Sequence, residues 1–206
     1  MISKTLSRPG RTALTAAAAL LAFSGMCLAA NFSADVVTKQ AGMSMKGKCY
    51  VQGENARQEM SMGSQKRVII SRADKGVTWM ISPAEKKYTE IPGVQSPQKM
   101  QAQLKKMAKE KYIGKEMLNG YACRKSQYTL PKGNPGTVMQ WTSEKLNWPV
   151  KTEIKQGQGR TAVIEFKNIK EANQSSALFA LPKGYKKTAM PTPPQMRAQP
   201  KAGKHR

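Results

Sequence analysis

Residues 66–82, KRVIISRADKGVTWMIS, decide how this chain of 206 residues folds. Two runs rich in Val, Ile and Trp flank Asp74-Lys75-Gly76, a sequence typical of a tight turn. Apolar side chains recur at alternate positions of both runs: Val68, Ile70, Val77, Trp79 and Ile81. Alternate positions of a strand share one face. The stretch therefore predicts an antiparallel hairpin of strands 66–73 and 76–82 with one apolar face.

The same pattern continues on both sides of this hairpin, with Gly, Asn, Asp or Pro punctuating the short runs. Asn119-Gly120 is an especially strong hairpin turn. Further strands are expected at residues 31–39, 43–52, 56–62, 86–91, 112–118, 121–130, 137–142, 149–156 and 160–169. The fold class is therefore mainly β (α+β), with an antiparallel sheet of about 11 strands.

One helix is expected to interrupt the strands. Ser96 suits the N-cap, Pro97 suits the first helical position, and Met100, Leu104 and Met107 recur at helical spacing. The other face of the helix is basic and carries Lys99, Lys105, Lys106 and Lys109. We expect this helix to cover an apolar face of the sheet.

The first 30 residues are typical of a cleaved secretory signal. Basic residues precede an apolar run at 13–23, which is too short for a permanent anchor, and small residues follow it. Cleavage is expected near Ala29 or Ala30, giving a periplasmic or secreted protein whose mature chain has no transmembrane segment. The alternative, a lipid anchor on Cys27, is disfavoured because Ser24 and Met26 do not suit it.

The mature chain is expected to form one domain over residues 31–187. Phe179 and Tyr185 are predicted to pack against the edge of the sheet. Residues 188–206 contain four prolines and no acidic residue, a composition that predicts a disordered basic tail.

Charge is the second strong feature of the sequence. The chain has 35 Lys and Arg residues against 12 Asp and Glu residues, a net charge of +23. Such a chain is drawn to anions, and export directs the expectation to an anionic membrane surface, an acidic polymer or an acidic protein rather than to nucleic acid. The alternative is that the charge only keeps the protein soluble.

Cys49 and Cys123 remain after cleavage and are expected to form a disulfide in an oxidising compartment. The alternative is two separate buried thiols.

The sequence offers little catalytic chemistry. Its single histidine, His205, lies in the tail, so no Ser-His or Cys-His pair is expected in the domain, and we predict a protein that is not an enzyme and has no cofactor.

Two Met-Ser-Met runs, at 43–45 and 60–62, have ligands suited to Cu(I). Strand alternation also places these methionines on one face, as an adaptable apolar surface, and this second interpretation is preferred.

Several motifs resemble one known family: Asn55-Ala56-Arg57-Gln58-Glu59, Lys87-Tyr88-Thr89-Glu90, Asn119-Gly120-Tyr121-Ala122-Cys123 and Leu181-Pro182-Lys183-Gly184-Tyr185. With them the chain resembles the LolA/LolB-like periplasmic lipoprotein-carrier superfamily, in its poorly characterised secreted branch. The resemblance implies an incomplete, strongly curved antiparallel barrel with helices over its concave face, a cavity for acyl chains and no catalysis. It also implies that Arg57 hydrogen-bonds to the covering helices.

The apolar strand face, the helix and the resemblance together give one set of expected cavity-lining residues: Met45, Met60, Met62, Ile70, Trp79, Ile81, Met100, Leu104 and Met107. The leading hypothesis is a non-enzymatic periplasmic binding protein with a lipid, acyl or other apolar ligand. The first alternative is an envelope structural or interaction protein with a packed core, which binds anionic polymers, lipids or an acidic partner through its basic surface and tail. Copper handling is the weaker alternative.

Overall fold

The computed structural model describes residues 30–189 except 64, 94–96 and 132–134. The expected signal and most of the expected tail lie outside these residues, as does the expected N-cap Ser96. The strands are β1 (Asn31–Gln40), β2 (Met43–Gln52), β3 (Asn55–Met62), β4 (Gln65–Arg72), β5 (Val77–Ser82), β6 (Lys87–Pro92), β7 (Lys109–Leu118), β8 (Tyr121–Thr129), β9 (Gly136–Ser143), β10 (Trp148–Gln156), β11 (Thr161–Glu171) and β12 (Lys186–Thr188). The helices are α1 (Pro97–Met107) and the short 3₁₀ turns η1 (Ala73–Lys75), η2 (Gly157–Gly159) and η3 (Ser176–Phe179).

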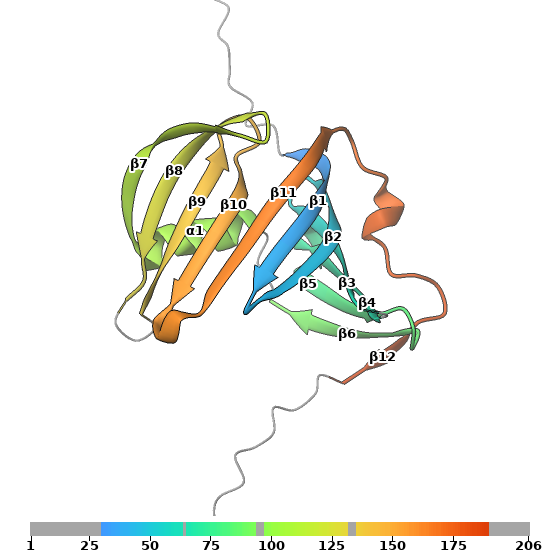
Figure 1. Ribbon diagram of the computed structural model, residues 1–206. Helices are drawn as coiled ribbons and strands as arrows, with labels where there is room; N and C mark the ends of the chain where they lie inside the picture. Colours follow the sequence, from blue (N-terminus) through green and yellow to red (C-terminus); the bar gives the residue numbers. More distant parts are fainter. Residues whose placement is uncertain (1–29, 64, 94–96, 132–134, 190–206) are drawn as a thin grey trace, which may run out of the picture.

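All 12 strands form one sheet in the order β12-β6-β5-β4-β3-β2-β1-β11-β10-β9-β8-β7. Every neighbouring pair is antiparallel except β12 with β6, which is parallel. The sheet curves strongly without closing, so β12 and β7 form its two edges (Figure 1). The expected mainly β fold, an incomplete barrel with one helix, is confirmed, whereas the three-residue strand β12 was not predicted.

Local turn chemistry sets the hairpins. Asn119 and Gly120 both have positive φ, 51° and 83°, the backbone of a tight two-residue turn between β7 and β8. Gly47 has a different role, because a Cβ at this position would collide with the backbone oxygen of Glu59. Only glycine therefore allows this close approach of β2 and β3.

The strand registers define the concave face of the sheet. One row of paired residues crosses β9, β10, β11, β1 and β2: Val138, Ile154, Ala162, Gln40 and Met43. Helix α1 packs on this face, where Leu104 contacts the cluster of Ala108, Tyr128 and Val138. Figure 1 shows α1 inside the curve of the sheet, behind β8 to β10. The expected packing of the helix on the sheet is therefore observed, but over one half only.

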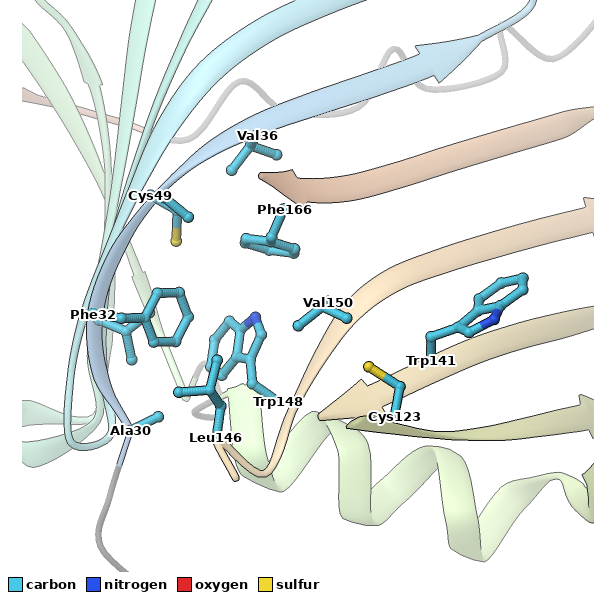
Figure 2. Packing of buried hydrophobic residues seen from close by; sticks show 12 residues of the cluster. Ala30, Phe32, Val36, Cys49, Cys123, Trp141, Leu146, Trp148, Val150 and Phe166 are labelled. Carbon is cyan, nitrogen blue, oxygen red and sulfur yellow. The ribbon is translucent and has the colours of Figure 1, made fainter. Parts of the chain in front are cut away.

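The largest core cluster joins residues from the two halves of the sheet (Figure 2). Phe32 of β1 is fully buried, and its ring lies 5.4 Å from that of Trp148 in an edge-to-face arrangement. Trp148 meets Phe166 of β11 in the same way at 5.9 Å. Each such pair contributes about 0.5–1.5 kcal/mol beyond the burial of its area.

A separate cluster lies on the convex face, and it contains three residues that were expected to line the cavity. Ile70, Trp79 and Ile81 are buried there together with Phe179 of η3. Their register partners are Arg57, Glu90 and Tyr88, whereas Met60 pairs with Arg67 and so points to the other face. The segment after β11, and not α1, buries these three residues.

The structure also differs from the prediction for the two cysteines. Cys49 and Cys123 are free, buried thiols, so the expected disulfide is not confirmed. They lie on β2 and β8, with β1, β11, β10 and β9 between these strands in the sheet. Both side chains belong to the same apolar cluster, which agrees with the alternative of separate buried thiols.

No helix among the described residues is long and apolar enough to cross a membrane.

Candidate ligand-binding surface on the concave face

The strands beyond α1 present a second apolar surface on the concave face. Rows of the register place Met45 beside Thr38, Met60 beside Gly47, and Met80 beside Ile69. Ile91 pairs with Thr78 on the same side. We call Met45, Met60, Ile69, Met80 and Ile91 the concave wall. Its members are partly exposed, and Met80 keeps 37% of its surface exposed.

Two hollows lie along this face. One has a volume of about 310 Å³ beside Ile69, Met80, Thr89 and Ile91. The other, of about 480 Å³, lies where β1 and β10 end and β11 begins, and is lined in part by Thr38, Ile154 and Ile164. Pockets for small ligands usually measure about 300–1,000 Å³. The concave face therefore combines hollows of ligand size with flexible thioether side chains that can adapt to a guest.

The structure separates the expected lining residues into groups. Met45 and Met60 belong to the concave wall, while the side chain of Met62 lies outside the described residues. Leu104 of α1 packs against Tyr128 and Val138 of the sheet, whereas Met100 and Met107 on the same helix are 59% and 66% exposed.

The sequence interpretation missed Ile69, Met80, Ile91, Ile154 and Ile164 on this face. Alternation alone could not find the first of these, because Ile69 and Ile70 are adjacent and both apolar.

The resemblance implied a hydrogen bond from Arg57 to the covering helices, whereas in the structure its partner is η3. Its Nη1 donates to the carbonyl oxygen of Leu178 at 3.0 Å, and its Nε donates to Glu59 at 2.8 Å. Arg72 repeats the arrangement, since its Nη1 donates to the carbonyl oxygen of Phe179 at 2.8 Å. Arg57 thus holds a strap on the convex face rather than a lid on the concave face.

Carboxylates keep both arginines in place. Partial burial acts to raise the pKa of Glu59, but hydrogen bonds from Arg57 and Lys66 hold it below its usual value. The hydrogen bond from Arg72 lowers the pKa of Asp74 to about 2. Both acids are therefore ionised at neutral pH and balance the guanidinium charges.

Acidic side chains elsewhere also serve mainly as partners of cations. Ten of the 12 carboxylates form ion pairs with Lys or Arg: Glu59, Asp74, Glu85, Glu90, Glu110, Glu116, Glu144, Glu153, Glu165 and Glu171. Within the part of the chain that the structure describes, no three His, Cys, Asp or Glu side chains gather as a metal site.

Several solved structures are similar to this chain. An uncharacterized conserved protein from Thermus thermophilus is 12% identical with a TM-score of 0.59, over 79% of this chain and 92% of that chain. A chain of the MucA/MucB complex of Pseudomonas aeruginosa is 13% identical with a TM-score of 0.51, over 73% of this chain and 55% of that chain. A LolA superfamily protein from Nitrosomonas europaea is 9% identical with a TM-score of 0.39, over 74% of this chain and 90% of that chain.

At these identities the likeness concerns the fold alone, and the chain spans about half of the length of its match in the MucA/MucB complex. No curated protein matches the sequence. The family described as a domain of unknown function (DUF4412) matches residues 34–147, more than half of the chain. The expectation of a poorly characterised domain agrees with this match to a domain of unknown function. The chain belongs to the DUF4412 family.

Proposed function

We propose that this protein is a non-enzymatic binding protein that holds an apolar ligand, such as an acyl chain, on its concave face. The observation that carries the proposal is the concave wall, in which Ile69, Met80 and Ile91 border a hollow of about 310 Å³. A second hollow of about 480 Å³ lies on the same face beside Ile154 and Ile164. Exposed apolar surface of this kind in a concave site is typical of ligand binding. The signal-like N-terminus supports a periplasmic or secreted place of action.

The first experiment tests whether a ligand co-purifies with the protein. Residues 30–206 purified from a periplasm without detergent are measured by native mass spectrometry, and the same sample is extracted for lipids. A stoichiometric adduct that extracts as an acyl lipid is the expected result. A bare mass that stays unchanged after incubation with envelope lipids would overturn the proposal.

A charge placed on the concave wall tests the site directly. Met80→Glu introduces a carboxylate beside Ile69, where an apolar chain would have to cover it. We expect the affinity for a fluorescent fatty acid to fall on the order of ten-fold or more, because burying an unpaired charge is costly. The matched control is Val37→Glu, which pairs with Lys46 in the register of the same sheet and shares the opposite face. Equal affinity of Met80→Glu and the control would exclude this lining.

One further observation favours a second function, binding of anionic surfaces. Lys48 and Lys170 border a hollow of about 460 Å³ on the convex face. Lys46 and Lys167 border the hollow next to it. If this cluster binds anionic lipid headgroups, Lys48→Glu will weaken binding to anionic vesicles at low salt more than Lys155→Glu on β10 does. Equal effects of the two variants would leave only the general charge of the protein as the cause.

A further inference from the structure

Strand β7 is an open edge of the sheet. Nine of its ten residues pair with β8 on one side, and no strand of the described residues pairs with the other side. Such an edge presents unpaired backbone N–H and C=O groups. It also carries exposed apolar side chains, since Tyr112, Ile113 and Met117 are 50%, 43% and 68% exposed. The opposite edge, β12, has only three residues.

The charges of β7 complement those of a second, antiparallel copy of the same strand. When Tyr112 lies opposite Ile113 of the other copy, Lys109 lies opposite Glu116 and Glu110 lies opposite Lys115. The twofold symmetry of such a pair repeats both contacts, and no like charges face each other. A shift that places Ile113 opposite itself would instead bring Glu110 against Glu116, which is unfavourable.

A bulge makes this register compatible with the two faces of the sheet. The pairing of β7 with β8 shifts between Tyr112 and Gly114, so Ile113 is an extra residue. As a result Glu110 and Lys115, five positions apart, share a face: they pair with Tyr128 and Arg124, which are four positions apart on β8. In a regular strand residues five apart would point to opposite faces.

We propose that two copies of this chain associate by antiparallel pairing of their β7 edges, so that two curved sheets join into one. Glu116 and Lys109 are both exposed on this edge. Glu116 accepts a hydrogen bond from Lys125 through Oε2 and stays 43% exposed, so a partner can still approach it. The pairing uses the edge of the sheet and is independent of the ligand proposed for the concave face.

Charge reversal tests the register. Lys109→Glu places two carboxylates opposite each other in a homodimer, and Glu116→Lys places two ammonium groups opposite each other. In a mixed dimer of the two variants, every facing pair is again of opposite charge. Sedimentation velocity of residues 30–206 measures the association of each protein alone and of the equimolar mixture.

The wild type is expected to sediment as a dimer. For each variant alone, the dissociation constant of the dimer is expected to be on the order of ten-fold higher than for the wild type. The effect is of this size because cross-strand charge pairs contribute modestly and each appears twice. The mixture should regain the dimer, and this recovery also shows that both variants are folded. Lys155→Glu on the distant strand β10 is the control. A monomeric wild type, or single variants as dimeric as the control, would overturn the proposal.

Discussion

At the scale of single residues, Arg57 and Arg72 have the same arrangement. Each guanidinium donates to one carbonyl oxygen at the end of η3 and to a carboxylate two residues along its own chain. Both side chains are only 16% exposed. A planar guanidinium can make both contacts at once, which the single ammonium group of lysine does poorly.

Replacement of Arg57 by alanine should destabilise the protein. The variant loses the bond to Leu178 and leaves Glu59 with only its partner Lys66, so we expect a loss of about 1–3 kcal/mol in the free energy of unfolding. Arg57→Lys should recover little of this. Urea unfolding measures the change, and the exposed Arg160→Ala serves as a control expected within about 0.5 kcal/mol of wild type. A neutral Arg57→Ala would contradict the role of this contact.

The second arginine predicts an acid dependence. The pKa of Asp74 is lowered from 3.8 to about 2 by the hydrogen bond from Arg72. Because the folded-state pKa is the lower one, the stabilisation is present above the unfolded value of 3.8 and is lost as the pH falls towards 2. Asp74→Asn should therefore unfold more easily than wild type near neutral pH.

The stability difference between Asp74→Asn and wild type should shrink across that acid range. Urea unfolding at several pH values measures it, with the exposed Glu54→Gln as the control. A difference that stays constant with pH would contradict the assignment.

At the scale of elements, the segment after β11 does what the sequence interpretation assigned to the helix. It covers Ile70, Trp79 and Ile81 through η3, and then continues into β12 along β6 (Figure 1). Ser175 caps η3 by accepting a hydrogen bond from the backbone N–H of Ala177. The convex surface of the β4–β5 hairpin is therefore closed core, and the open apolar surface lies on the concave side.

Phe179 is the apolar anchor of that segment. It is 3% exposed and packs in the cluster of Ile70, Trp79 and Ile81, so Phe179→Ala should cost about 3–5 kcal/mol in the free energy of unfolding. Met43→Ala, at a side chain that is 64% exposed, is the control and should be nearly neutral. Thermal and urea unfolding measure both variants. A cost below about 1 kcal/mol would show that the segment packs loosely on the sheet.

At the scale of the whole molecule, one core connects the two halves of the sheet. Cys49 comes from β2 and Cys123 from β8, and both are buried in the cluster of Phe32, Trp148 and Phe166 (Figure 2). Burial raises the pKa of the Cys49 thiol to about 12. Neither thiol is therefore reactive in the folded protein, although both are free.

These thiols report on cooperative opening of the core. In residues 30–206 a thiol reagent near pH 8 should modify neither cysteine of the native protein and both after unfolding without reductant. Because they share one cluster, Cys49 and Cys123 should react at the same rate in partly denaturing urea, measured by peptide mass spectrometry. Fast labelling of one alone would show that the halves open separately. Two unreactive cysteines after unfolding would indicate the disulfide.

The sequence by itself determined the strands, the helix and their order. Signals such as Asn119-Gly120 and Asp74-Lys75-Gly76 act within a few residues, because they depend on backbone conformations that few residue types adopt. Helix α1 accordingly begins at Pro97, as its local signals predicted. Resemblance supplied the open barrel, which the unclosed 12-stranded sheet confirms.

Only the tertiary structure decided which face of each strand lines the concavity. Ile69 and Ile70 are both apolar, and each is suited to an interior; their faces differ because η3 covers one side and the curve of the sheet encloses the other. The same holds for β12 and for the two thiols, whose positions depend on strands far apart in the sequence. Contacts of this kind arise from sheet curvature and long-range packing, and these leave no local pattern in the chain.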